Sequence, residues 1–207
     1  MILYVETNFV LELAYGQGEG GSCGALMDLA ESEDALGLAL PAFCVGEAYG
    51  SQIRRQRDRE TVQRDLLKKM GELSRSPLYA GRTEAVGEVA ALLAETGEAE
   101  RRGLEGVFAR LYESATLIPL DEGVAREAQR RQADRGLGPQ DALVYASVLG
   151  HLRRLRGGES SAEGESCFVT RDNDFADEDV RTDLEELGCK LLFTFDAALG
   201  YVRSRLP

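Results

Sequence analysis

Acidic side chains follow two of the short apolar runs in this chain. Asp172 and Asp174 come directly after residues 167–170, and Glu6 comes directly after residues 2–5. A short buried strand that ends in acids is typical of an open α/β sheet, because such a sheet binds ligands beyond the carboxyl ends of its strands. We therefore expect these three carboxylates to lie at the same edge of a sheet.

Two further acids fall near the starts of expected helices. Glu47 lies in the second turn of the helix expected after Pro41, and Asp141 is the third residue of the helix that Pro139 opens. The carboxyl ends of parallel strands and the amino ends of the following helices face the same way, so we expect all five acids to converge. Each acid alone also has an ordinary structural explanation, such as the helix dipole for Asp141 or an Asx-turn after the last run.

Convergence of these acids would have an electrostatic cost. Two carboxylates about 4 Å apart repel each other by roughly 4 kcal/mol at an effective dielectric constant of 20. Such a cluster either takes up protons or binds a cation. The chain has one histidine and four widely spaced cysteines, Cys23, Cys44, Cys167 and Cys189, which we expect to be buried thiols in a reducing compartment. Oxygen ligands without nearby nitrogen or sulfur favour Mg²⁺ or Mn²⁺ over zinc.

The hydrophobic pattern predicts one domain over residues 1–207 with a three-layer α/β/α fold and a central parallel sheet of about five short strands. We expect the strands at residues 2–5, 36–40, 116–118, 167–170 and 190–193. We expect helices at residues 9–15, 23–31, 42–69, 121–133, 140–154, 179–187 and 197–205. Thr7 and Asn8 are expected to cap the first helix. Residues 82–115 are expected to form a helical hairpin interrupted near Gly97, and residues 157–166 a mobile loop.

Composition and charge restrict the function further. No apolar run approaches the roughly 20 residues of a membrane helix, and the first residues lack the basic region of a secretory signal, so we expect a cytoplasmic protein without a membrane contact. The net charge of −12 opposes non-specific binding of nucleic acid. Local arginine clusters could still contact phosphates or could be paired with neighbouring acids. These clusters are Arg54, Arg55, Arg57 and Arg59; Arg130, Arg131 and Arg135; and Arg153, Arg154 and Arg156, with Arg171 inside the last acidic block.

Four blocks of the sequence, in this order, resemble the PIN-domain nucleases, a family that includes the toxin ribonucleases of bacterial toxin–antitoxin pairs. The blocks are residues 4–11 (YVETNFVL), 41–47 (PAFCVGE), 140–146 (QDALVYA) and 168–175 (FVTRDNDF). The resemblance implies cleavage of RNA that depends on Mg²⁺ or Mn²⁺. It also makes a homodimer and an antitoxin-like protein partner plausible.

The resemblance implies roles for particular side chains. It makes Glu47, Asp141 and Asp172 metal ligands or water-activating acids, with Asp174 in support. Asn8 and Thr170 would orient these acids. The family usually has aspartate where this chain has Glu6, and the segment at about 52–115 is longer than in minimal toxins.

We therefore expect a metal-dependent endoribonuclease, and the resemblance makes the toxin of a toxin–antitoxin pair a plausible role. Its catalytic acids would be Glu6, Glu47, Asp141 and Asp172, and its metal ligands Glu6, Asp141, Asp172 and Asp174. Its RNA contacts would be Arg54, Arg55, Arg153, Arg154 and Arg171. Two alternatives remain open: a catalytically weakened PIN-like module that binds RNA or a protein, and a metal phosphatase that acts on small substrates.

Overall fold

A five-stranded parallel sheet forms the centre of the molecule. The computed structural model describes residues 1–79, 84–157 and 165–206. The strands are β1 (Ile2–Tyr4), β2 (Gly37–Pro41), β3 (Ala115–Ile118), β4 (Ser166–Val169) and β5 (Cys189–Leu192), arranged in the order β3-β2-β1-β4-β5. Each expected strand is present within about two residues of its predicted bounds. The sheet confirms the predicted three-layer α/β/α fold.

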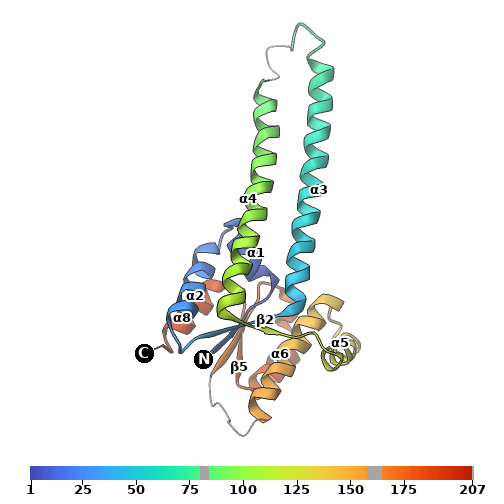
Figure 1. Cartoon of the computed structure of the whole chain (residues 1–207). Helices are drawn as coiled ribbons and strands as arrows, with labels where there is room; N and C mark the ends of the chain where they lie inside the picture. The colour runs from blue at the N-terminus through green and yellow to red at the C-terminus, as the bar shows by residue number, and fades with distance from the viewer. Residues whose placement is uncertain (80–83, 158–164, 207) are drawn as a thin grey trace.

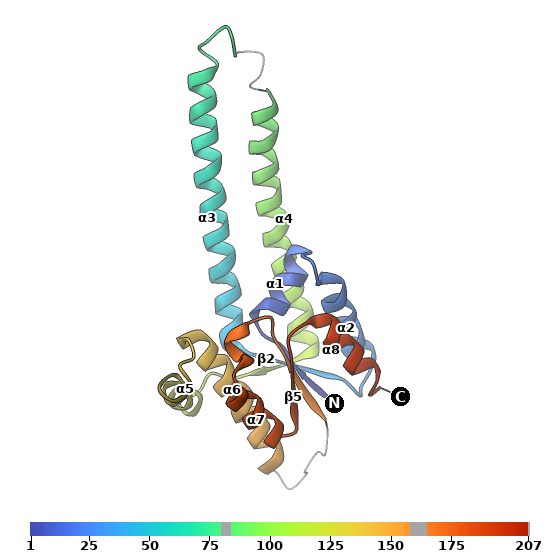
Figure 2. The same ribbon diagram turned by 180° about the vertical axis from the view of Figure 1, so that it is seen from behind.

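Helices cover both faces of this sheet. They are α1 (Thr7–Tyr15), α2 (Gly20–Ser32), α3 (Ala42–Leu73), α4 (Glu84–Ser114), α5 (Glu122–Arg135), α6 (Pro139–Gly157), α7 (Glu178–Glu186) and α8 (Phe195–Arg203), with the 3₁₀ helix η2 (Asn173–Ala176) before α7. Helices α1, α2 and α8 lie on one side of the sheet, and α5, α6 and α7 on the other (Figures 1 and 2). No helix of the described ranges is long and apolar enough to cross a membrane.

The three inner strands, β2, β1 and β4, are largely apolar because the sheet is buried on both faces there. Leu3 of the central strand β1 is fully buried between Leu38 of β2 and Cys167 of β4. Every residue of β4 is buried, which explains why this run lacks the polar alternation of a half-exposed strand. All four cysteines are buried free thiols, as expected. The acids that follow β1 and β4 are therefore carried by the two adjacent strands at the buried centre of the sheet.

Helices α3 and α4 form a long hairpin that projects from the α/β core (Figure 1). The expectation of a hairpin within residues 82–115 is therefore wrong. Helix α4 continues through Gly97, and its partner in the hairpin is α3. A glycine inside a helix costs only about 1 kcal/mol relative to alanine, which the many good helix formers around it outweigh. In α3, only Cys44, Ala48 and Gln52 are buried, so the outer half of this helix is largely solvated.

The base of α4 packs closely on α1. At Gly103, an added Cβ atom would overlap the carbonyl oxygen of Ala14, so only glycine permits this approach of the two helices. The side chains of Leu104, Phe108 and Leu111 are buried at the same end of α4. This contact fixes the hairpin to the helix that follows β1.

The residue that caps the first helix differs from the prediction. Glu6 caps α1, and its Oε2 accepts a hydrogen bond of 2.8 Å from the backbone N–H of Asn8, so the expected caps Thr7 and Asn8 are wrong. Glutamate reaches back to this N–H because its backbone is extended at the cap position. Asp121 caps α5 as expected, with a 2.8 Å bond from the backbone N–H of Val124. The expected mobile loop lies mostly outside the described residues, which omit 158–164.

Candidate metal centre

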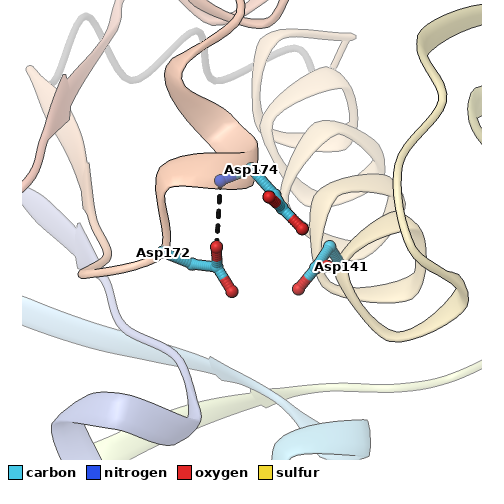
Figure 3. A group of neighbouring side chains, drawn as sticks. All are labelled: Asp141, Asp172 and Asp174. Atoms are coloured by element: carbon cyan, nitrogen blue, oxygen red, sulfur yellow. Dashed lines mark hydrogen bonds between the residues drawn. The ribbon is translucent and has the colours of Figure 1, made fainter.

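Three aspartates come together beyond the carboxyl end of β4. One carboxylate oxygen from each of Asp141, Asp172 and Asp174 lies within 4.8 Å of the others (Figure 3). Asp141 comes from the first turn of α6, whereas the other two come from the segment after β4. Oδ1 of Asp172 accepts a 2.9 Å hydrogen bond from the backbone N–H of Asp174. This bond forms the Asx-turn that was the structural alternative to a binding site here, so the turn and the group of three aspartates are both present.

A cavity of about 220 Å³ lies beside these aspartates. Its lining includes four of the five expected acids, namely Glu6, Glu47, Asp141 and Asp172. The remaining acid, Asp174, belongs to the group of three through Asp141 and Asp172. The fold therefore gathers at one place acids that are far apart in the sequence. Of the expected acids, only Glu6 and Glu47 stand outside the group that could share one ion.

Glu6 is tied to the aspartates through Thr170. Only 6% of Glu6 is exposed, and both of its carboxylate oxygens accept hydrogen bonds from the protein. Oε2 accepts from the backbone N–H of Asn8 at 2.8 Å, and Oε1 accepts from Oγ1 of the fully buried Thr170 at 3.3 Å. Thr170 Oγ1 in turn accepts from the backbone N–H of Asp172 at 2.9 Å. Asn8 and Thr170 thus lie where an orienting role needs them, and metal ligation by Glu6 stays a prediction.

Glu47 reaches the cavity from α3 and is held by Thr7, for which the sequence predicted only a role as a helix cap. Its Oε2 accepts a short hydrogen bond from Oγ1 of Thr7. The available signal was the position of Thr7, one residue beyond Glu6 in the first motif block. Ser51 and Arg54, one and two turns beyond Glu47 on α3, also line the cavity. Arg54 adds a positive charge to a lining whose other charged residues are acids.

Burial and crowding shift the protonation of this site. Burial raises the pKa of Glu6 to about 7, although the hydrogen bonds from Asn8 and Thr170 oppose this rise. Burial also raises the pKa of Asp141 to about 6, and the negative charges of Asp172, Asp174 and Glu47 add to the shift. The cluster consequently holds protons at a pH where isolated carboxylates are ionised. A divalent cation would relieve the same repulsion, and the all-oxygen donor set suits Mg²⁺ or Mn²⁺.

The expected RNA-binding arginines separate into one at the cavity and four elsewhere. Arg54 lines the cavity. The other four are paired with acids outside the cavity: Arg55 with Glu100 at 3.1 Å, Arg153 with Glu127 at 3.3 Å, Arg154 with Asp121 at 3.7 Å, and Arg171 with Glu12. The sequence did not show these pairs because each partner lies in or caps another helix and is at least 26 residues away from its arginine. Arg54 is thus the expected RNA-binding residue that lies at the acids, and RNA contacts by all five arginines stay a prediction.

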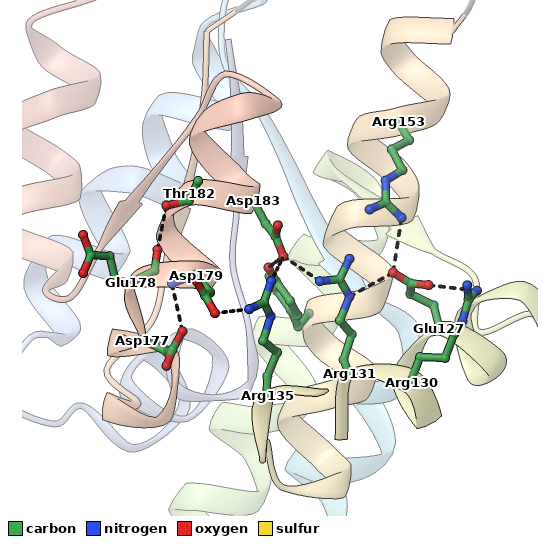
Figure 4. Close-up of polar contacts among 11 residues, drawn as sticks. Glu127, Arg130, Arg131, Arg135, Arg153, Asp177, Glu178, Asp179, Thr182 and Asp183 are labelled. Carbon is green, nitrogen blue, oxygen red and sulfur yellow. Dashed lines mark hydrogen bonds and ion pairs between the residues drawn. The ribbon is translucent and has the colours of Figure 1, made fainter. Parts of the chain in front are cut away.

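The arginine cluster on α5 belongs to a structural ion-pair network. Arg131 bridges Glu127, at 2.9 Å, and Asp183 of α7, at 2.6 Å (Figure 4). Arg135 also contacts Asp183, at 3.3 Å, and the hydroxyl of Tyr145 on α6 donates to the same carboxylate at 2.9 Å. These contacts join α5, α6 and α7 to one another. The interpretation of a paired helix face is therefore correct for this cluster.

Glu12 is a buried acid that sequence reasoning missed. Only 4% of it is exposed, and it forms an ion pair with Arg171. Its other oxygen accepts a 3.0 Å hydrogen bond from the backbone N–H of Glu19. The signal was an acid inside the otherwise apolar run of α1. Because Arg171 directly precedes Asp172, this pair fastens the aspartate-bearing segment to α1.

Comparisons with family models, with curated proteins and with solved structures gave no match to this chain. The resemblance to PIN-domain nucleases therefore remains a hypothesis that rests on the four sequence blocks. What the structure adds is the class of fold, a three-layer α/β/α protein with an acidic cavity at the carboxyl edge of its parallel sheet.

Proposed function

We propose that this protein is a Mg²⁺- or Mn²⁺-dependent endoribonuclease of the PIN type. The observation that carries the proposal is the convergence of Asp141, Asp172 and Asp174 within 4.8 Å, beside a cavity that Glu6 and Glu47 also line. Carboxylates crowded in this way are unfavourable without protons or a cation. Sites with several carboxylates and room for a substrate suit hydrolysis of phosphate esters.

The three aspartates would hold the metal ion. A divalent cation bound there would neutralise charge on a phosphodiester and make a bound water more acidic. Glu47, positioned by Thr7, would accept one proton of a water whose oxygen bonds to phosphorus. The bond from phosphorus to the leaving oxygen would break, and that oxygen would take a proton from solvent. Glu6 and Thr170 would hold the aspartate-bearing segment in place through the hydrogen bonds at Asp172. Arg54 would bind a phosphate at the cavity.

The experiment is cleavage of single-stranded RNA by the purified full-length protein in Mn²⁺. We expect cleavage by the wild type and a loss of at least about 100-fold for Asp141→Asn and for Asp172→Asn, because each removes one negative ligand. Asp65→Asn is the matched control, since it removes an exposed acid of α3 outside the cavity. Circular dichroism should show that all variants are folded. Unchanged cleavage by Asp141→Asn would exclude this role for the residue.

A second candidate is a PIN-like module that binds RNA or a protein without cutting it. The observation that favours it is Glu6, which stands where the family usually has aspartate and which uses both carboxylate oxygens within the protein. Catalytic geometry is sensitive to displacements of about 1 Å, so the longer side chain could misplace the water. RNA binding without cleavage in Mn²⁺ would support this candidate, and turnover of a generic phosphomonoester would instead support the phosphatase.

The cellular setting belongs to the same proposal. A toxin role in the cytoplasm, with a homodimer and an antitoxin-like partner, rests on the resemblance alone. The test is the neighbouring reading frame: a small DNA-binding protein encoded just upstream would support the toxin role. Inhibition of RNA cleavage by that protein would identify it as the antitoxin.

A further inference from the structure

We propose that Arg171 is a positioning residue of the metal site rather than a contact for RNA. Its ion pair with the buried Glu12 fixes the segment that carries Asp172 and Asp174, so that both aspartates meet Asp141 at one ion. This role deepens the function proposed above and rests on it. It concerns the one arginine of the last motif block, which directly precedes Asp172 in the sequence.

Glu12 is placed to hold a positive charge. It lies in the middle of α1, and only 4% of it is exposed. Its Oε2 accepts a 3.0 Å hydrogen bond from the backbone N–H of Glu19, and its Oε1 accepts a short hydrogen bond from Nη1 of Arg171. A buried carboxylate is unfavourable without a cation or hydrogen-bond donors. Among the residues that the structure describes, the cation that pairs with Glu12 is Arg171, so this contact is strongly preferred.

The ion pair also determines where the side chain of Arg171 lies. The guanidinium reaches α1, and Arg171 is absent from the described residues that line the acidic cavity. Contact with RNA inside the cavity would require Arg171 to leave Glu12 and to strand a buried charge. The geometry therefore favours a role within the protein over a role in binding the substrate.

Two successive side chains fasten the end of β4 to two points of α1. Oγ1 of Thr170 donates a 3.3 Å hydrogen bond to Oε1 of Glu6, the cap of α1, and accepts one of 2.9 Å from the backbone N–H of Asp172. Arg171 binds Glu12, which is six residues, or about 9 Å, farther along the same helix. One anchor would leave the segment free to turn about it. Two anchors define both its position and its direction.

The aspartates lie between these anchors and a third one downstream. Oδ1 of Asp172 accepts a 2.9 Å hydrogen bond from the backbone N–H of Asp174 (Figure 3). The next residue, Phe175, is buried, and its ring meets that of Phe168 edge-on at a centroid distance of 5.3 Å. Without the pair of Arg171 and Glu12, the upstream end would be held by Thr170 alone. Groups that orient metal ligands typically contribute 10- to 100-fold to metal affinity.

Three roles of Arg171 predict different effects of the substitution Arg171→Gln. If the residue acted only through its charge, Mn²⁺ would bind more tightly, because a cation that repels the metal would be gone. If it bound RNA, KM for RNA would rise while Mn²⁺ affinity and kcat stayed unchanged. As a positioning residue, its loss weakens Mn²⁺ binding.

The first experiment is calorimetric titration of the full-length protein with Mn²⁺. We expect Arg171→Gln and Glu12→Gln each to weaken binding by about 10-fold. The double variant should weaken binding by about the same factor and not by the product of the two, because both single changes break one interaction. The double variant also leaves no unpaired buried charge, so it should remain folded, which circular dichroism checks. The control is Arg181→Gln, which removes a positive charge from an exposed position of α7.

The second experiment measures cleavage of single-stranded RNA over a range of Mn²⁺ concentrations. The double variant should need about 10 times more Mn²⁺ for half-maximal cleavage and should keep the wild-type KM for RNA at saturating Mn²⁺. A raised KM at every Mn²⁺ concentration, with normal Mn²⁺ affinity, would instead identify Arg171 as an RNA contact and overturn the positioning role.

The positioning role and the proposed function fail in different ways. Wild-type protein that neither binds Mn²⁺ nor cuts RNA would overturn both. Wild-type protein that cuts RNA, together with a double variant that binds Mn²⁺ as tightly as the wild type or more tightly, would overturn only the positioning role. Mn²⁺ binding without cleavage would overturn the nuclease function, and the titration would still decide the role of Arg171.

Discussion

The substitution Asp141→Asn should stabilise the metal-free protein at alkaline pH. Burial and the neighbouring acids raise the pKa of Asp141 from 3.8 to about 6, so its ionised form is unfavourable in the folded state. The destabilisation is absent below pH 3.8, grows as pH rises toward 6, and is complete above that value. Asparagine has nearly the same shape and carries no charge. The variant should therefore be more stable than the wild type at pH 8 but not near pH 4.

The magnitude follows from the shift in pKa. A rise from 3.8 to about 6 is roughly two pKa units, and each unit corresponds to 1.36 kcal/mol, which gives an upper limit of about 3 kcal/mol. Asp141 is partly exposed, so solvent screening reduces this value. We expect a gain of about 1 kcal/mol at pH 8, or about 2–4 °C in the melting temperature of a chain of this size.

The assay is thermal unfolding in chelator at pH 8 and pH 4, with Asp65→Asn as a matched control of unchanged stability. Mn²⁺ at about 100 times its dissociation constant should then stabilise the wild type by about 2.7 kcal/mol and stabilise Asp141→Asn far less. The order of stability should thus reverse when the metal is added. A variant that is less stable than the wild type without metal at pH 8, or that gains equally at pH 4, would refute this reasoning.

Two further predictions concern how the site is held. Thr170→Val should lower the free energy of unfolding by about 1–3 kcal/mol, because Glu6 Oε1 and the backbone N–H of Asp172 both lose their hydrogen-bond partner, and the variant should also bind Mn²⁺ more weakly. Urea unfolding measures this loss, with Thr182→Val at an exposed position as the control. Equal losses in the two variants would contradict the prediction. Gly103→Ala should cost about 3 kcal/mol by overlap with α1, whereas Gly106→Ala, whose added Cβ meets nothing within 4 Å, should gain about 0.5–1 kcal/mol in the same assay. Similar effects of both alanines would contradict the close packing of the two helices.

Much of the fold was predictable from the sequence because its inner strands are buried on both faces. The runs around Leu3 and Phe168 contain no charged residue that could obscure the pattern. The parallel arrangement then follows from strands that alternate with helices, and it brings the acids at the strand ends to one edge. The grouping of the three aspartates agrees with this reasoning from topology.

The hairpin could not be predicted in the same way. Beyond Gln52, α3 buries no side chain, so its sequence lacks the apolar stripe that marks a helix packed on a core. Its pairing with α4 depends on contacts such as Arg59 with Glu100, which are 41 residues apart. The predicted break at Gly97 gave one glycine more weight than its helix propensity justifies.

The partners of single charged residues were also beyond sequence reasoning. Arg171 sits among the acids of the last motif block, yet its side chain pairs with Glu12 on α1. Glu6 could be placed at the end of β1, but its use of both oxygens inside the protein depends on the exact positions of Asn8 and Thr170. Such pairings are set by packing over distances that no local pattern encodes.

Calorimetric titration of the metal-free protein with Mn²⁺ near pH 6, where Glu6 and Asp141 still hold protons, tests the metal site most directly. We expect saturable binding by the wild type, release of protons that burial and crowding hold on Glu6 and Asp141, and a loss of affinity of at least about 10-fold in Asp141→Asn and Asp172→Asn. Wild-type protein that binds no Mn²⁺, or variants that bind it as tightly as the wild type, would contradict a metal held by these aspartates.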